Sequence, residues 1–424
     1  MVGDGMEKVV RTKKGKNKNR KIGMRYYDFN LAFLILFACA IGLIIIYSAS
    51  AYIAKSKNLE STYFLKRQLI TIGAGFGLMI LFSFINYKWF KFRVKLPVPR
   101  FLRAVLHRKS FVISLPGTLL VGMTVLQGYT SFLAPIHNGA RRWLIVGGFT
   151  FQPSELAKFV VIIYGAYICS KNPGKVNTVG GFVKAMFLVA PLIALILKEN
   201  LSAAIIVAAI YGVIIFVNAK KTIPYFILAV IAGIGVKVGV KFFGGYRSDR
   251  FEILENVETS EKGQQILQGL YAIASGGLFG KGLGGSEQKY RRVPEAYNDM
   301  IFTIICEEFG LFGGLAIILL FALIIVRMFV VIMNAKDRFG ALVGVGIMSQ
   351  IAIQVVLNIL VVTSVIPSTG VILPFISFGG TAVIIMLFEI GIFLNISWQI
   401  EYKNRLLAKR AKKYYNNNRA LSLR

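Results

Sequence analysis

The 424-residue sequence is poor in charged residues and in the residues that most often hold metals. Only 16% of the residues are charged and 56% are hydrophobic, whereas soluble chains average about 25% charged residues. The 3 cysteines and 2 histidines are Cys39, Cys169, Cys306, His107 and His137. Their wide separation excludes a disulfide framework or zinc motif and argues against a histidine-based metal site. A chain this apolar requires lipid as its solvent.

Acidic residues are scarce as well, with 19 Asp+Glu against 50 Lys+Arg and a formal net charge of +31. In a soluble protein such a charge would indicate nucleic-acid binding. Here most basic residues stand in short runs between apolar stretches. That pattern is typical of topology signals and of contacts with anionic lipid, so we expect no nucleic-acid partner.

Ten apolar runs of about 20 residues predict an all-α polytopic membrane protein with about ten transmembrane helices. The first run is too long for the core of a signal peptide, so we expect it to be uncleaved. The expected organisation is a basic tail (1–27), a ten-helix membrane domain (28–398) and a second basic tail (399–424). The predicted spans are 29–53, 68–86, 111–131, 154–170, 180–198, 201–218, 222–243, 300–333, 339–363 and 380–398.

The basic residues orient these spans with both termini in the cytoplasm, as expected for a multi-pass protein of the cytoplasmic membrane. The longest loop, 244–299, then lies outside, and loops of this length are usually functional. Its glutamates from Glu252 to Glu261 recur every three residues, which indicates a solvated acidic face. The apolar residues from Ile266 to Ile273 follow helical spacing and predict a helix on the outer membrane surface.

Acids inside predicted spans are functional candidates because burying their charge in a membrane is costly. Glu155 and Lys158 are three residues apart and share one helix face. They form either a self-neutralising pair that orients the helix or a charged site facing a polar cavity. The candidate acids are Glu155, Glu199, Glu307, Glu308 and Glu389.

Asp299 stands where the long loop enters the eighth span, a position that also suits a helix N-cap. Together with Glu307 and Glu308 it forms a group of acids larger than capping requires. Upstream, Arg141 and Arg142 fit a lipid anchor and a diphosphate clamp equally well.

Two glycine-rich segments flank these residues. Segment 276–285 looks superficially like a nucleotide phosphate loop, but Ser275 and Gly282 occupy positions where that motif requires Gly and Ser or Thr. We expect a flexible turn there, or a backbone nest for a lipid-linked phosphate. Segment 367–380 contains prolines and glycines that cannot continue a lipid-facing helix. It predicts a wall of the site.

Together these residues resemble the SEDS family of bacterial membrane proteins, which comprises FtsW, RodA and SpoVE. The resemblance spans 28–398 and rests on segments 138–158, 264–314 and 358–395. It implies a peptidoglycan glycosyltransferase that polymerises lipid II, an undecaprenyl-diphosphate-linked disaccharide-pentapeptide, outside the cytoplasmic membrane. The family's Pro-Glu-x-x-x-Asp motif falls on 294–299, so Asp299 is the implied catalytic residue. The implied substrate-binding residues are Arg141, Arg142, Glu155, Lys158, Glu295 and Ser377.

The sequence departs from the family pattern at two places. Tyr297 and Asn298 stand where the family often has His-Thr, and Met300 stands where it often has Phe. The hairpin between the fifth and sixth spans reads Glu199-Asn200-Leu201-Ser202 instead of Pro-Asp-Leu-Gly. An acid is therefore missing from the hairpin, while the catalytic aspartate is retained.

The chemistry agrees with these residues. Asp299 as general base would take the proton of an acceptor sugar hydroxyl, and direct displacement would invert the anomeric centre. Arginine, lysine or a divalent cation (Mg or Mn) would stabilise the leaving diphosphate; the metal ligands are not evident, and no organic cofactor is expected. The resemblance also implies a class B penicillin-binding protein and other divisome or elongasome membrane proteins as partners, in division, elongation or sporulation.

Two other functions are compatible with ten spans. A lipid II flippase also needs polar residues and broken helices in the membrane, but its polar route must cross the whole bilayer. Asp299, Arg141 and Arg142 map to the outer side, as do the two glycine-rich segments 276–285 and 367–380, and this position favours the enzyme. A scaffold that recruits division proteins through its tails would not explain the clustered acids.

Overall fold

The computed structural model describes residues 28–97, 110–136, 139–146, 149–171, 173–176, 178–219, 263–290, 296–367 and 369–421. Several predictions fall outside these residues and are not tested by the structure. They are the tail 1–27, the span 222–243, the acidic repeat from Glu252 to Glu261 and the motif residue Glu295.

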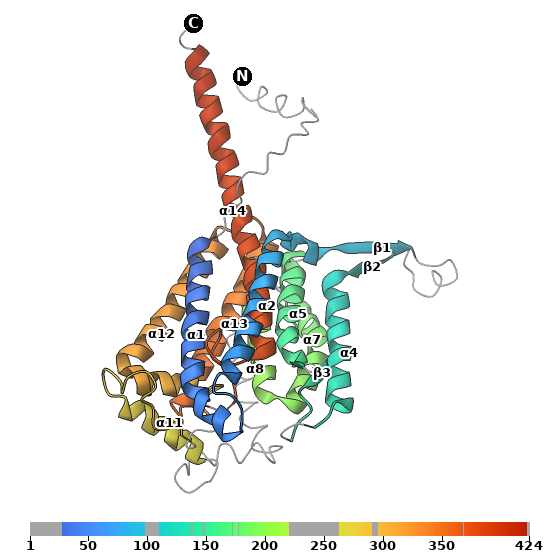
Figure 1. Cartoon of the computed structure of the whole chain (residues 1–424). Coiled ribbons are helices and arrows are strands. Elements are labelled where there is room, and N and C mark those ends of the chain that lie inside the picture. The colour runs from blue at the N-terminus through green and yellow to red at the C-terminus, as the bar shows by residue number, and fades with distance from the viewer. Residues whose placement is uncertain are drawn as a thin grey trace.

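Long helices occupy the places of nine of the ten predicted spans within the described residues, and they form a bundle (Figure 1). By length and composition, 6 of them qualify on their own as membrane spans: α1, α2, α8, α12, α13 and α14. The count of ten therefore stays a prediction. The long helices are α1 (Phe29–Ser56), α2 (Tyr63–Phe84), α4 (Leu115–Leu133), α5 (Pro153–Lys171), α7 (Val179–Glu199), α8 (Leu201–Asn218), α12 (Ile301–Met333), α13 (Arg338–Val362) and α14 (Gly380–Leu421).

Two short antiparallel hairpins were not predicted. Strand β1 (Arg93–Pro97) pairs with β2 (Ser110–Ser114), and β3 (Leu144–Val146) pairs with β4 (Phe149–Phe151). Residues 111–114 belong to β2, so α4 begins four residues later than the predicted third span, with Pro116 in its first turn, where proline costs no hydrogen bond. Figure 1 shows β1 and β2 projecting sideways from the bundle.

Shorter helices connect the spans: η2 (Tyr87–Lys91), α6 (Pro173–Val176) and α11 (Gly263–Ser275). Helix α11 confirms the predicted helical spacing, and it packs against α12 through buried Ile266 and Ala272. The hairpin between α7 and α8 is as tight as predicted, because Asn200 ends one helix and caps the next by accepting from the Ala203 N–H at 3.1 Å.

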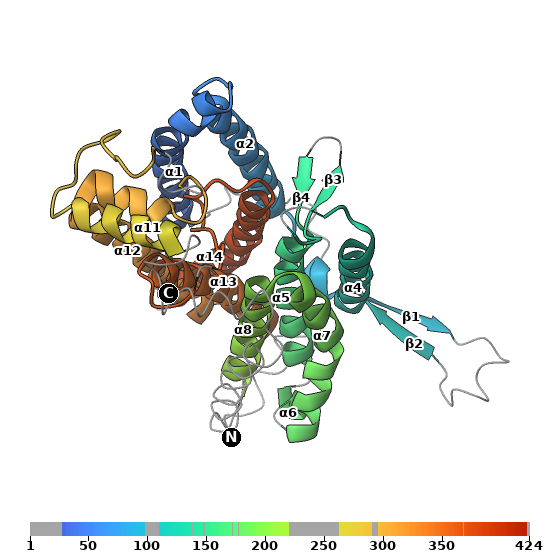
Figure 2. The ribbon, with the colours of Figure 1, turned by 90° about the horizontal axis from the view of Figure 1, so that it is seen from below.

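The core of the bundle surrounds α5, almost all of whose residues are buried. It packs against α4, α8 and α13, and Figure 2 shows it among these helices in the end-on view. Helices α2 and α14 approach so closely that a Cβ on Gly391 would lie 2.4 Å from the Met79 carbonyl oxygen. Helix α14 does not end at residue 398 but continues to Leu421, beyond the end of the bundle (Figure 1).

Helix α12 is interrupted at Gly310, whose φ of 67° and ψ of −164° are not helical. Residues 277–282, in the glycine segment 276–290, form hydrogen bonds with the backbone groups that the break leaves unpaired. The N–H groups of Lys281 and Gly282 donate to the carbonyls of Glu307 and Glu308 at 2.9 Å each. In return, the N–H of Leu311 donates to the Gly277 carbonyl at 2.9 Å. The segment is therefore an ordered part of the fold rather than a flexible turn.

Candidate functional site

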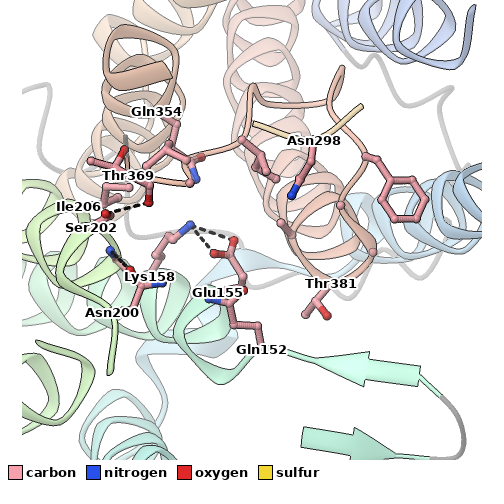
Figure 3. Close-up of a pocket in the computed structure, with 18 of the residues that line it drawn as sticks. Gln152, Glu155, Lys158, Asn200, Ser202, Ile206, Asn298, Gln354, Thr369 and Thr381 are labelled. Carbon is pink, nitrogen blue, oxygen red and sulfur yellow. Dashed lines mark hydrogen bonds and ion pairs between the residues drawn. The ribbon is translucent and has the colours of Figure 1, made fainter. Parts of the chain in front are cut away.

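A cavity of about 290 Å³ lies between α5, α8 and α13, and is closed by the irregular segments 296–300 and 369–379 (Figure 3). Polar side chains supply much of its lining. Among the lining residues, Lys158 is the sole cation and Glu155 the sole anion. The polar lining residues are Thr150, Gln152, Glu155, Lys158, Asn200, Ser202, Asn298, Gln354, Thr369 and Thr381.

Glu155 and Lys158 lie in the first two turns of α5 and form an ion pair inside this cavity. The Lys158 ammonium donates to both carboxylate oxygens of Glu155 at 2.8 Å, as Figure 3 shows. Lys158 is 1% exposed and Glu155 9%. Both predicted interpretations hold in part, because the charges neutralise one another and also face a polar cavity.

The segment 369–379 forms a wall of the cavity, as its prolines and glycines predicted. Non-helical backbone is tolerated in a membrane only where other protein groups satisfy it. Ser202 Oγ donates to the Thr369 carbonyl at 3.0 Å, and the buried Asn358 amide donates to the Val371 carbonyl at 2.7 Å. Gln68 of α2 donates to the Ser377 carbonyl at 3.3 Å.

Ser377, a predicted substrate-binding residue, is fully buried inside this wall. Its hydroxyl accepts the Leu373 N–H at 2.9 Å, and its own N–H donates to the Leu373 carbonyl at 3.0 Å. It is not among the residues lining the cavity. In the structure Ser377 shapes the turn.

Asp299, the predicted general base, lies two residues before α12, whose N-cap position is Met300. It follows Tyr297 and Asn298, which both line the cavity. A Cβ on Gly370 would lie 3.8 Å from the Asp299 carboxylate, and the same Asn358 amide that holds Val371 also donates to the Asp299 carbonyl at 2.8 Å. The structure thus places Asp299 at the junction of the two irregular walls.

Arg141 and Arg142 are engaged at the C-terminal end of α7 instead of lining the cavity. The Arg141 N–H donates to the Glu199 carboxylate at 2.8 Å, and its guanidinium donates to the Phe132 carbonyl. Arg142 Nε donates to the Glu199 carbonyl at 2.7 Å. Neighbouring Trp143 does line the cavity, so the two arginines stand beside the site rather than in it.

Glu307 and Glu308 face the glycine segment 276–290 and not the cavity. Glu307 is fully buried and accepts from Lys281 at 3.1 Å, from Ser286 at 2.5 Å and from the Glu287 N–H at 3.0 Å. Burial lowers the pKa of Lys281, but the hydrogen bond and charge of Glu307, with Glu287, outweigh it and raise that pKa above its ordinary value.

Glu308 is 1% exposed and is held in a similar way from the other side of α12. It accepts from Lys289 at 2.9 Å and from Ser48 of α1 at 2.6 Å. The two acids therefore fix the glycine segment to the bundle.

Residues 29–402 match the family model described as cell cycle protein, FtsW/RodA/SpoVE. The chain belongs to the FtsW/RodA/SpoVE family. Among its relatives is stage V sporulation protein E of Bacillus subtilis, 36% identical over 88% of this chain and 98% of the relative. Another is the Bacillus subtilis protein named "Probable peptidoglycan glycosyltransferase FtsW", 34% identical over 89% of this chain and 92% of the relative.

Solved structures confirm the FtsW/RodA/SpoVE fold. A chain of a peptidoglycan synthase complex, solved to describe how polymerization and crosslinking are coordinated, superposes with a TM-score of 0.70 and 24% identity. The match covers 88% of this chain and 97% of that one. RodA of Thermus thermophilus superposes with a TM-score of 0.61 and 22% identity, over 88% and 97% of the two chains. The protein is therefore a multi-pass membrane protein of this fold.

Sequence reasoning missed two residues that complete the site of this family member. Gln354 lines the cavity, and Asn358 joins its walls. Gln354 and Asn358 are four residues apart on α13, a spacing that places both on one face. A pair of amides on one face of an apolar helix was the signal that could have identified them.

The predicted divalent cation has no protein-only site in the residues that the structure describes, since no three His, Cys, Asp or Glu side chains gather there. Both Glu155 oxygens already accept from Lys158. The described residues therefore do not form a metal site from side chains alone.

Proposed function

We propose that this protein polymerises lipid II into glycan strands at the outer face of the cytoplasmic membrane. Its enzyme class is peptidoglycan glycosyltransferase, the activity in the name of its FtsW relatives. The observation that carries the proposal is the position of Asp299, whose carboxylate lies at the junction of two irregular walls around a cavity with a buried ammonium group. Asp299 does not line the cavity itself but adjoins it at that junction, while Lys158 supplies a cation inside it.

The reaction joins an acceptor sugar to a donor sugar carried on a lipid diphosphate. Asp299 takes the proton of the acceptor hydroxyl. The hydroxyl oxygen then bonds to the anomeric carbon of the donor while the bond from that carbon to the diphosphate oxygen breaks. The anomeric centre is inverted, the lipid diphosphate leaves with the bonding electrons, and the proton stays on Asp299 until solvent removes it.

Lys158 is the residue that we assign to the diphosphate. Negative charge grows on the leaving group, and a fixed ammonium in a site of low dielectric stabilises that charge more strongly than water does. Glu155 holds the Lys158 ammonium in place. Arg141 and Arg142 bind the diphosphate or lipid at the edge of the cavity in this proposal, and Glu295 keeps its predicted substrate-binding role. Buried Ser377 acts instead by shaping the wall of the cavity.

A divalent cation, Mg or Mn, belongs to the proposal as a companion of the substrate. Such cations are commonly bound by one or two carboxylates together with substrate phosphates. When bound, the cation would neutralise part of the diphosphate charge. No step of the reaction above depends on it.

The proposed partners and orientation follow from the same family. We expect a class B penicillin-binding protein beside this chain, together with other divisome or elongasome proteins, and the similarity to a chain of a peptidoglycan synthase complex supports this expectation. The basic residues of the sequence support cytoplasmic termini. In this orientation the glycine segment and the walls of the cavity face the outside.

The proposal is tested by polymerisation of labelled lipid II with purified protein, with and without a class B penicillin-binding protein. We expect glycan strands from the wild type and a loss of about 10²–10⁴-fold for Asp299→Asn, the range that general-base catalysis contributes. Asn298→Asp in the Asp299→Asn background is the matched control, because it moves the carboxylate by one residue and should not restore activity. Transport of lipid II across liposomes without polymer would instead support a flippase.

A further inference from the structure

One buried acid takes no part in the mechanism proposed above. Glu389 of α14 is 1% exposed. Gln350 of α13 donates to one of its carboxylate oxygens at 2.9 Å. The other oxygen is buried and has no hydrogen-bond partner. An ionised carboxylate with one such free oxygen is costly in an apolar interior.

Helix α5 packs against α14 next to Glu389, with the rings of Phe159 and Phe388 at 4.8 Å between centroids. The charged groups of α5 that act on Glu389 are Lys158 and Glu155. The other helices packed against α14 place no further ionisable side chain beside Glu389. Helix α2 has none after Arg67, and α13 has none after Arg338. The basic residues of η2 lie further along α14, where Tyr87 meets Asn395.

The cluster therefore holds one lysine and two glutamates in the described residues. If both glutamates are ionised its net charge is −1; if one carries a proton it is zero. Glu155 accepts from Lys158 through both of its oxygens, whereas Glu389 has one oxygen without a donor. Glu389 is thus the site where a proton satisfies both the charge and the unpaired oxygen.

This balance matters because the cavity is proposed to receive a diphosphate. A cluster with net charge −1 would repel that group, since Coulomb interactions are strong in a site of low dielectric. A neutral cluster removes this repulsion, so that the Lys158 ammonium can attract the diphosphate. We propose that Glu389 is a positioning residue that carries a proton when the diphosphate binds, and so sets the charge that Lys158 offers to the substrate.

The inference rests on the proposed function, and a binding measurement separates the two. Affinity for lipid II is measured between pH 6 and 9 in the Asp299→Asn background, where turnover is strongly slowed and position 299 no longer titrates. We expect affinity to fall at alkaline pH by up to about tenfold per pH unit as Glu389 loses its proton.

Glu389→Gln mimics the protonated carboxyl and keeps an acceptor for Gln350. We expect this variant to bind lipid II at least as tightly as its parent and to lose the alkaline weakening. Glu389→Asp retains a titratable group and should keep the weakening. The same alkaline weakening in Glu389→Gln would overturn the inference. Binding that does not depend on pH in the parent would also overturn it, and that measurement does not require a position-389 variant to fold.

Polymerisation by the wild type is assayed in parallel. Failure of that assay refutes the proposed function, whereas an unaltered pH dependence of binding in Glu389→Gln refutes only the role of Glu389.

Discussion

Two regions of this molecule contain buried pairs of lysine and glutamate, and they differ in what surrounds them. The Glu155–Lys158 pair faces a cavity lined with polar side chains. The Glu307–Lys281 and Glu308–Lys289 pairs face the glycine segment, and Ser286, the Glu287 N–H and Ser48 of α1 donate to the same two acids. Burial of an acid in a helix is common to both regions. The polar lining of the adjoining cavity distinguishes the first region, because the cavity that Lys289 lines is mostly apolar.

The largest effect on stability is expected at Glu307. Glu307→Leu would leave Lys281, Ser286 and the Glu287 N–H without their shared acceptor. Leaving buried donors without an acceptor costs about 1–3 kcal/mol each, so the thermal unfolding midpoint in detergent should fall strongly.

The matched control is Glu287→Gln, because Glu287 also pairs with Lys281, at 3.4 Å, but its side chain is 71% exposed. Exposed pairs contribute little, so this variant should unfold like the wild type. Equal destabilisation by both variants would contradict the structural role of Glu307.

The next effect is on activity, at Lys158. Lys158→Met removes the cation that we assign to the leaving diphosphate, and we expect kcat/KM for lipid II to fall by about 10²–10³-fold. Lys289→Met removes an equally buried ammonium from the glycine segment. It should lower thermal stability yet keep kcat/KM of the folded fraction within about threefold. If Lys289→Met lowered kcat/KM more than Lys158→Met did, the reaction site would lie at the glycine segment.

The smallest effect is expected at Gly282 of the glycine segment, which has nearly the same φ as Gly280. Gly280 has a φ of 81°, and a Cβ there would lie 2.2 Å from the Glu308 carbonyl oxygen; Gly282 has a φ of 86° and open space around it. Gly282→Ala should therefore cost only the strain of a positive φ, about 1–3 kcal/mol. Gly280→Ala should cost about 1–3 kcal/mol more because of the clash.

Unfolding midpoints of these two variants measure how tightly the segment is packed onto α12. Equal midpoints would show that Gly280 is not in close contact with Glu308 in solution.

Hydropathy was sufficient to predict most of the bundle. Helix α8 has the predicted bounds of 201–218, because the apolar run between Asn200 and Asn218 defines where the helix begins and ends. The β1–β2 hairpin was missed for the opposite reason. Residues 111–113 are apolar and adjoin a span, and only pairing with β1 distinguishes a strand from the first turn of a helix.

The site was predictable where its contacts are local. Glu155 and Lys158 are three residues apart, so helical geometry alone predicted their contact. The partners of Glu307 and Glu308 are 26 and 19 residues away in sequence, at Lys281 and Lys289. Spacing carries no information about such contacts, and for this reason the glycine segment was interpreted as a flexible turn.

The directions of individual side chains could not be predicted from the sequence either. Ser377 and Arg141 stand in the segments that the family resemblance selected, but each hydrogen-bonds to neighbouring backbone instead of lining the cavity. Their orientation depends on tertiary packing, which no local pattern specifies. Glu389 was recognised as a candidate acid, but its proximity to Lys158 appears only once α5 and α14 are placed together.

The break at Gly310 divides α12 into a short part and a long part. A continuous helix of 33 residues would extend for about 50 Å, well beyond the roughly 30 Å of hydrocarbon in a bilayer. The part after Gly310, 311–333, is about 34 Å long and is long enough to cross the membrane by itself. Residues 301–309 then form a separate helical segment, which carries Glu307 and Glu308 and follows Asp299. In the orientation proposed above, Gly310 would mark the level at which α12 passes from lipid into the layer of the proposed reaction.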